Sequence, residues 1–541
     1  MESPQGLELD YSSAIRSKAE NKVEGEKTGN EFTDQPANKN VGNQEAIEEA
    51  SRDTTMPPGH DAARMTEILE KRKARESITM KPLLAAPTRE QTPNPILEFN
   101  KADISFNSQP WISTNITFTL SKNKKNWRPQ PSNALKNSLL AGVGFLELAN
   151  AADFAANVWN EIPVPTFAAV LMGIGGVFAI TISFFAFHDI VLARRNYKVL
   201  IRERRILKNR EESKERNTYL SVNFRELGTE IIDRIGMDAF MGFGAVMVGV
   251  GTLLAIGGAN PRVYDASNLL SGYIGNTPVA LFGIFNAFWS IFVVARAQRH
   301  RHHARKSLTS ADEKEVLNLL RQRTRKVQSH ATIMGSIGII AGGGSLVTSE
   351  HWEGYPILIP CIVLSAYCNW IWRKKVGYSR ALCDTTSSPI ANMEKGALME
   401  EISINAALLK SYRGFKRIPI LENIVEEPES MASILEFLVR YDLFTSFCAR
   451  VLKEVTLRKS VLEPTLEGQT EIVISPADFL LLGRKACFLA LKDVADEVVK
   501  KGIKEKLMYR ERFLLEALGC LLVVERRMSM RKERDGTEKG K

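Results

Sequence analysis

The chain has 541 residues, of which 44% are hydrophobic and 25% are charged, and its formal net charge is +10. This composition suits apolar membrane spans that are diluted by polar flanks. The positive charge does not indicate nucleic-acid binding, because the excess lies beside apolar stretches and no zinc finger, RNA-binding aromatic motif or basic DNA-reading helix accompanies it. We therefore expect no nucleic-acid partner.

Residues 1–95 are predicted to be a disordered cytosolic arm. Residues 1–58 are rich in Glu, Lys, Asn, Gly and Ser and contain almost no aromatic residues. Such a segment cannot bury enough apolar area to offset its chain entropy. Its first residues lack the apolar core of a secretory signal, and their acids disfavour a mitochondrial presequence.

Residues 96–134 are predicted to be a short pre-membrane segment with possible strands. Ile116, Phe118 and Leu120 alternate with polar residues, which is the period-2 pattern of a half-buried strand. The segment 102–106, with the sequence ADISF, is a candidate partner strand.

Residues 135–375 are predicted to be a membrane domain with six transmembrane helices arranged as three hairpins. The expected spans are about 135–156, 165–192, 235–258, 278–295, 331–347 and 355–372. At about 1.5 Å per residue, most of these stretches are long enough to cross a hydrocarbon core of roughly 30 Å, whereas the fifth is marginal. The chain is therefore interpreted as an all-α polytopic membrane protein.

The basic residues predict which side each loop faces. They gather in the connection 194–216, in 296–306 with the residues that follow, and in 373–380, whereas the alternate connections 157–164, 260–277 and 348–355 contain almost none. Lys and Arg accumulate in short cytoplasmic loops because their translocation is unfavourable. Both termini are therefore predicted to be cytosolic, and the basic loops are predicted to contact anionic lipid headgroups.

Small residues are dense in the first helix of each predicted hairpin, for example in 241–258 and 333–346. In lipid, small residues let helix backbones approach closely, and van der Waals packing then drives their association. We interpret these glycines as packing residues in preference to a substrate path.

Acidic residues inside the spans are the candidate functional residues. Asp189 and Asp238 lie near the basic boundary, where pairing with Arg194, Arg195 or Arg234 accounts for them. Glu147 and Asp153 in the first span have no such neighbours, and charges at bilayer depth often mark ion or proton routes. These two acids are the candidate transport residues.

No catalytic, cofactor-binding or metal-binding residue is predicted. His300, His302 and His303 lack a carboxylate or thiol neighbour in the sequence, and they lack the i, i+4 spacing that places two ligands on one helical face. They are interpreted as a basic patch beside the membrane. No cofactor is expected, and an enzyme is the least supported class.

Residues 376–541 are predicted to be a cytosolic helical domain. Apolar residues from Ile434 to Val455 recur at steps of three and four, which predicts a helix over about 428–458. A second helix is expected to begin at Ser475-Pro476, and a third at 503–527. We expect these helices to form a bundle; a surface for a cytosolic partner or for a second copy of the chain is the alternative.

The function expected from these features is that of a non-enzymatic structural or interaction protein with several membrane spans and a cytosolic helical bundle. The alternative is a transporter or channel for a small ion or solute that uses Glu147 and Asp153.

Overall fold

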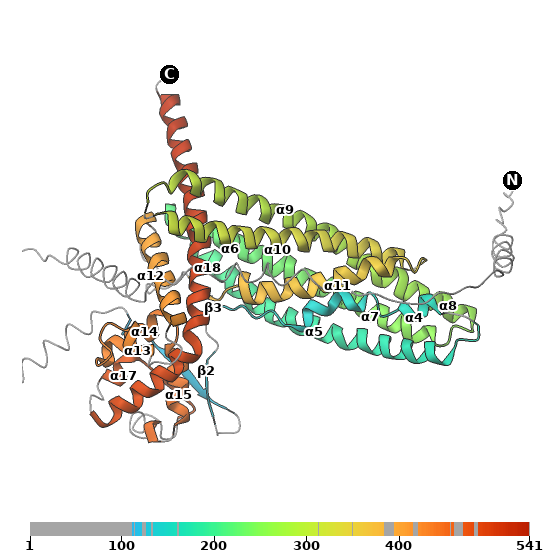
Figure 1. Ribbon diagram of the computed structural model, residues 1–541, viewed down its shortest axis with the longest axis horizontal. Coiled ribbons are helices and arrows are strands. Elements are labelled where there is room, and N and C mark those ends of the chain that lie inside the picture. Colours follow the sequence, from blue (N-terminus) through green and yellow to red (C-terminus); the bar gives the residue numbers. More distant parts are fainter. Residues whose placement is uncertain are drawn as a thin grey trace, which may run out of the picture. The chain divides into compact units, whose positions relative to one another are not determined.

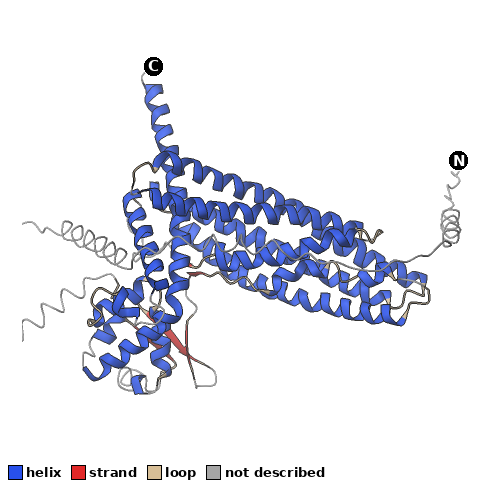
Figure 2. Ribbon diagram, viewed as in Figure 1, coloured by secondary structure: helices blue, strands red, loops and turns tan. Residues whose placement is uncertain are grey.

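The computed structural model describes residues 111–539, apart from the segments 113, 122–125, 131–133, 160–161, 312, 349, 383–393, 415–419, 455, 459–468 and 481–484. The arm predicted to be disordered (1–95) and the candidate strand 102–106 lie outside these residues. The described residues belong to one compact unit, and they are mostly helical, with a few short strands (Figure 2).

Within the described residues, five helices are long and apolar enough to cross a membrane (Figure 1). Two of them are single elements, α5 (Thr166–Lys208) and α10 (Glu313–Val347). The other three contain π-helical segments: α6 (Lys214–Gly228) continues through η4 (Thr229–Gly236) into α7 (Met237–Ala255), and α8 (Pro261–Asn268) continues through η5 (Leu269–Gly275) into α9 (Asn276–Ser307). The last, α11 (Gly354–Ile371), continues into η6 (Trp372–Val376). These helices contain the predicted spans from the second to the sixth almost entirely. The helices are longer than those spans because their basic ends continue the same helices. In addition, most of the predicted outer connection 260–277 is helical as α8 and η5.

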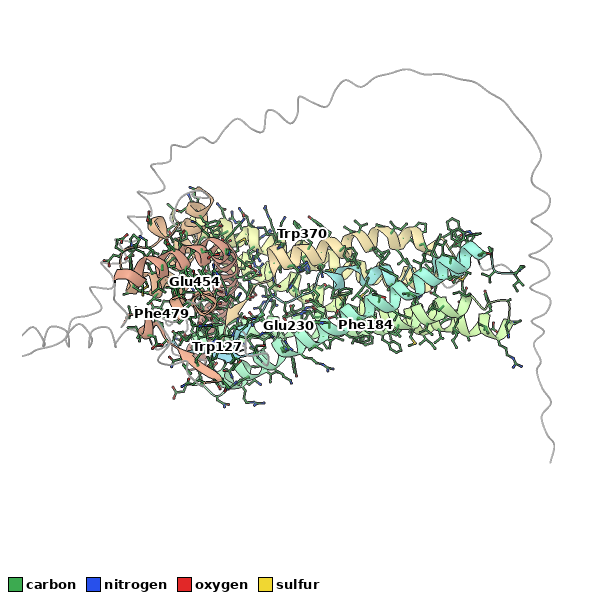
Figure 3. All side chains as sticks on the ribbon, turned by 90° about the horizontal axis from the view of Figure 1, so that it is seen from below. Trp127, Phe184, Glu230, Trp370, Glu454 and Phe479 are labelled. Atoms are coloured by element: carbon green, nitrogen blue, oxygen red, sulfur yellow. The ribbon has the colours of Figure 1, made fainter. Side chains whose placement is uncertain are left out.

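Large apolar side chains point outward along these helices. Phe184 of α5 is 66% exposed and Phe288 of α9 is 69% exposed. In Figure 3, Phe184 and Trp370 lie on the long helices, whereas Phe479 lies at the opposite end of the molecule, in the C-terminal region. So many exposed aromatic and aliphatic side chains are unfavourable in water, and they are typical of a lipid-facing surface.

The prediction of one helical span over 135–156 is wrong. Residues 136–141 are not helical, and they lead into the 3₁₀-helical η3 (Gly142–Phe145), α3 (Leu146–Ala149) and α4 (Phe154–Val158). Two glycines weaken the helix, and Asn150 and Asp153 fall in the turn between α3 and α4, where such side chains compete with helical hydrogen bonding.

This broken segment runs antiparallel to α5. Lys136 exchanges hydrogen bonds with Asn196 (3.2 and 2.8 Å), and Asp189 accepts from the Leu140 amide (3.0 Å). Asn369 of α11 donates to the Leu140 carbonyl (3.1 Å). Irregular backbone is tolerated at membrane depth when protein groups satisfy it, and these side chains provide that satisfaction.

The most extensive helix packing joins α5 with α7 and α9 with α10. Each of these pairs is connected on the side where the basic residues gather, so the predicted outer hairpins are not the main packing units. A Cβ atom added to Gly283 of α9 would lie 2.0 Å from the Gly338 carbonyl oxygen of α10. Glycine therefore sets the spacing of this pair, as the small-residue pattern predicts.

The remaining elements gather beyond the basic ends of the long helices. They are α12 (Lys395–Gly414), α13 (Ile420–Ile424), α14 (Met431–Arg440), α15 (Phe444–Lys453), α17 (Pro476–Leu480) and α18 (Lys485–Lys539), with strands β1 (Ile116–Leu120), β2 (Trp127–Pro129), β3 (Ala134–Leu135), β4 (Arg380–Ala381) and β5 (Glu471–Ile474). The predicted strand at 116–120 is confirmed as β1. It pairs antiparallel with β2 and β5, so Phe118 lies opposite Ile472.

Two predicted C-terminal helices have different bounds. The helix expected over 428–458 divides into α14 and α15, because Asp442 adopts a left-handed conformation (φ 54°) and the Leu443 amide donates to the Leu438 carbonyl (2.7 Å). The helix expected at 503–527 is the middle of the longer α18. Even so, the apolar stripe from Ile434 to Val451 is buried as expected.

Two hydrophobic cores lie in this region. One surrounds Phe118 and Phe447 and contains residues of α14, α15 and α18. The other joins Leu200 of α5, Leu320 of α10 and Leu518 of α18. The second core therefore continues the bundle helices directly into the C-terminal region.

Candidate functional site: buried charges of the bundle and its junction

The two candidate transport residues lie in the broken segment, and each has its own partner. Asn150 donates to Glu147 (2.9 Å), and the Tyr355 hydroxyl donates to Asp153 Oδ1 (2.8 Å). Both carboxyl groups are buried. Among the described residues, Asp153 Oδ2 lacks a hydrogen-bond partner, and no described contact joins the two acids.

A second group of charges lies between α5 and η4. Arg234 contacts Asp189 (2.8 Å) and Glu230 (2.9 Å), and Asn196 donates to Glu230 (3.0 Å). The predicted pairing of Asp189 is therefore confirmed for Arg234. Arg234 also interacts electrostatically with the neighbouring Asp238.

The largest group of buried charges lies where the long helices meet the C-terminal region. Arg380 of β4 contacts Glu203 of α5 (2.7 Å) and Glu226 of α6 (2.5 Å). The Tyr378 hydroxyl donates to Glu226 (2.7 Å) and accepts from Arg225 (2.8 Å). This network joins three segments that are distant in the sequence, and it leaves neither glutamate unpaired.

Glu516 extends the network to α18. It lies 3.6 Å from Arg225 and 3.4 Å from Arg296 of α9, and Arg296 also donates to the Ser221 carbonyl (2.9 Å). We call Arg225, Arg296, Arg323, Glu516 and His300 the junction cluster. All five side chains are buried, and they come from α6, α9, α10 and α18.

The arginines determine the ionisation of Glu516. Burial by itself raises the pKa of this carboxyl group, but the charges of Arg225 and Arg296 outweigh burial and hold the pKa below its usual range. Burial raises the pKa of the nearby Cys520 thiol to about 11. Glu516 is therefore charged at neutral pH and Cys520 is a neutral thiol.

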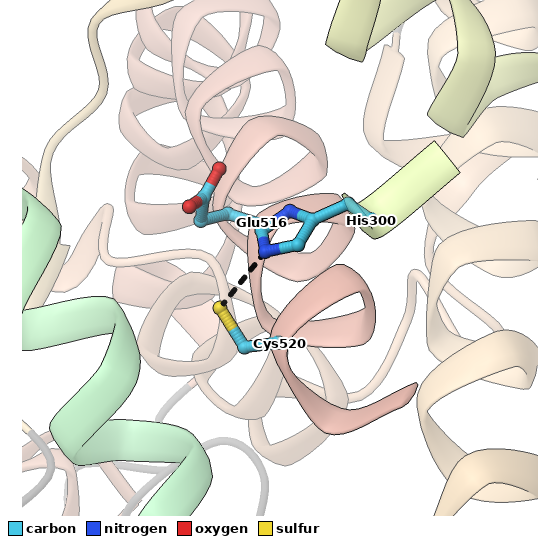
Figure 4. Close-up of side chains that lie close together, drawn as sticks. All are labelled: His300, Glu516 and Cys520. Atoms are coloured by element: carbon cyan, nitrogen blue, oxygen red, sulfur yellow. Dashed lines mark hydrogen bonds between the residues drawn. The ribbon is translucent and has the colours of Figure 1, made fainter. Parts of the chain in front are cut away.

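His300, Glu516 and Cys520 bring three potential metal ligands within 4.8 Å of one another (Figure 4). Arg296 already donates to the Cys520 sulfur (2.9 Å) and approaches Glu516. A metal site needs a thiolate and free carboxylate oxygens. The adjacent arginines instead repel a cation, so this group fits a metal ion poorly.

Three small cavities extend from this junction into the bundle. The first, of about 10 Å³, is lined by the junction cluster. The second, of about 20 Å³, shares Arg225 with it, and the third, of about 40 Å³, reaches Asn286 and Asn369. A cavity of about 10–15 Å³ holds one water molecule. Each of these cavities therefore has room for one to a few particles the size of a water molecule.

Sequence reasoning missed the junction. In the sequence, Arg296, Arg323 and Arg380 belong to basic stretches that predict only topology, and no pattern singles out Glu226 or Glu516. Arg380 and Glu203 are 177 residues apart. In the sequence, these buried arginines lie among exposed arginines and lysines, and no local pattern distinguishes a buried arginine from an exposed one.

The part of the chain that the structure describes is mainly helical, and five of its helices are long and apolar enough to cross a membrane. Comparison with protein-family models, with curated proteins and with solved structures finds no significant match.

Proposed function

We propose that the chain is an integral membrane protein that holds a helical domain in a fixed orientation at the cytosolic membrane surface, as a non-enzymatic structural or interaction protein. The observation that carries this proposal is the junction. There, buried ion pairs and the hydrophobic core of Leu200, Leu320 and Leu518 connect α18 with the bundle. A flexible tether needs no such buried contacts.

The proposed topology has six crossings. Five are the long helices, and the sixth is the broken segment 136–158, which lies beside Asn196 at one end and beside Tyr355 at the other, where Asn157 donates to the Tyr355 hydroxyl (2.6 Å). An even number of crossings places both termini on one side. The basic ends of α5, α9 and α11 support a cytosolic location for that side, because Lys and Arg are translocated with difficulty.

Two kinds of partner fit the exposed surface. Arg194, Arg195 and Lys198 are exposed at the end of the apolar part of α5, where anionic lipid headgroups would lie. The last turns of α18, from Met528 to Arg534, are mainly exposed and charged, and they offer a surface for a cytosolic protein or a second copy of the chain.

Distance measurements on the full-length protein in lipid vesicles test the fixed orientation. Spin labels placed at Arg202 of α5 and Lys504 of α18, both exposed, should give one narrow distance distribution. Arg380→Met should broaden it, because this change leaves Glu203 and Glu226 without their shared partner. Arg305→Met, on an exposed part of α9, is the matched control and should leave it narrow. A broad distribution in the unaltered protein would contradict the proposal.

Transport remains the second candidate, because Asp153 has a buried oxygen without a described hydrogen bond and lies on a broken helix, as do substrate sites of many transporters. If this candidate holds, Glu147→Gln and Asp153→Asn should abolish ion or proton flux in loaded vesicles without loss of assembled protein. Glu353→Gln, at an exposed acid, should transport normally. Absence of flux from the unaltered protein under every imposed gradient would eliminate this candidate.

A further inference from the structure

The cavity of the junction cluster contains more positive than negative charge. Arg225, Arg296 and Arg323 contribute three positive charges to its lining and Glu516 one negative charge, so two positive charges are in excess. Outside the lining, Arg380 is already paired with Glu203 and Glu226, and Arg512 adds a positive charge that acts on Arg323.

Several donors in this lining are also unused. Arg323 donates from Nη1 to the Val376 carbonyl (2.7 Å), but its Nε and Nη2 atoms have no hydrogen-bond partner among the described residues. The Arg225 Nε atom also has no hydrogen-bond partner among the described residues, although it lies 3.6 Å from a Glu516 carboxylate oxygen. Arg323 is 4% exposed and Arg225 is 5% exposed, so bulk water does not reach these donors freely. A buried, uncompensated charge is strongly unfavourable.

We propose that this cavity binds one chloride ion. A monatomic anion offsets half of the excess charge of the lining and accepts hydrogen bonds from Arg323 and Arg225, whereas a water molecule accepts hydrogen bonds but offsets no charge. The volume of about 10 Å³ has room for one particle near the size of water, which excludes phosphate and sulfate.

The position of the site gives it a structural role. Its arginines come from α6, α9 and α10, and a bound anion relieves their mutual repulsion and draws these three helices toward one point. Arg225 and Arg296 also lie beside Glu516 of α18, so the same arginines connect the anion site with α18. Chloride binding should therefore stabilise the attachment of α18 to the bundle. Chloride would stabilise the junction whether or not the bundle transports an ion or solute.

The first test compares the thermal unfolding of the full-length protein in detergent with sodium chloride or with sodium gluconate at equal ionic strength. Chloride should raise the unfolding temperature until the site saturates, because a ligand that binds the folded state stabilises it. Arg323→Gln should lose this chloride-dependent shift, whereas Arg305→Gln, an exposed control on α9, should keep it. Equal temperatures in the two salts, or a normal shift in Arg323→Gln, would overturn the proposal.

A second measurement uses the unaltered protein, so it does not depend on the folding of any variant. Bromide replaces chloride in similar sites and scatters X-rays anomalously. Crystals grown with bromide should show one anomalous peak among Arg225, Arg296 and Arg323. An empty cavity at saturating bromide, or bromide at exposed arginines only, would contradict the proposal.

Discussion

Arg380 makes the closest set of charged contacts at the junction, since its guanidinium pairs with Glu203 and Glu226 together. Arg380→Met should lower the free energy of unfolding by about 3–5 kcal/mol, because it removes the ion pairs that Arg380 makes with two buried carboxylates. Denaturant unfolding of the purified protein measures this loss. Adding Glu203→Gln and Glu226→Gln to the same chain should recover part of it. No recovery would indicate that packing, not charge, is the main role of Arg380.

Glu516 should make stability depend on pH on the acid side. Its pKa is lower in the folded protein than in the unfolded chain, so its contribution is fully present above the unfolded value of about 4.3. The contribution is lost as the pH falls through the lower folded pKa, when Glu516 takes up a proton. The free energy of unfolding, measured from neutral to strongly acidic pH, should therefore decrease less steeply for Glu516→Gln than for the unaltered protein. Parallel curves would contradict this pairing.

At the scale of the helices, glycine spacing should decide the packing of α9 on α10. Gly283→Ala places a methyl group 2.0 Å from a backbone oxygen, so the helices must separate, at a cost of about 1–3 kcal/mol. Gly343→Ala on α10 is the matched control, because nothing lies within 4 Å of its added Cβ atom. Thermal unfolding in detergent compares the two variants. A Gly283→Ala protein as stable as the control would disprove the close approach.

Strand β1 should be an integral part of the C-terminal region although it precedes the bundle in the sequence. Phe118→Ala should cost about 3–5 kcal/mol, because the ring is fully buried in the core that contains Phe447. Val473→Ala on the neighbouring β5 should be nearly neutral, since that side chain is 54% exposed. Near-ultraviolet circular dichroism during denaturation reports the transition. Equal stability of the two variants would show that β1 is dispensable.

The elements were predictable where the signal is local. Apolar length identified the long helices from the second predicted span onward, and alternation identified β1. The prediction of the first span failed because the hydropathy of this segment resembles that of a membrane helix. Gly142, Gly144 and Asn150 favour an interrupted helix, and hydrogen bonds from neighbouring helices satisfy its irregular backbone. The junction was not predictable, because Arg380 and Glu516 acquire their roles from partners on other elements.

For the whole molecule, the proposed topology makes a definite prediction for tags. A tag between Arg210 and Glu212, in the turn after α5, and a tag after Lys541 should be protected in sealed vesicles that keep their cytosolic side inside. A tag between Gly258 and Ala259, in the turn between α7 and α8, should be cleaved from outside. Accessibility of the first and third tags from the same side would refute the proposed arrangement of crossings.

The unbroken course of α5 has a mechanical consequence. This helix runs from Thr166 to Lys208, so its lipid-facing part and the part that carries Glu203 form one rigid rod. A bilayer thinner than the apolar surface makes such helices tilt, at a modest cost per ångström of mismatch. On the proposed topology, any tilt of α5 turns Glu203 and its partner Arg380 by the same angle. On the same proposal, we expect a change in bilayer thickness to change the orientation of α18 relative to the membrane plane.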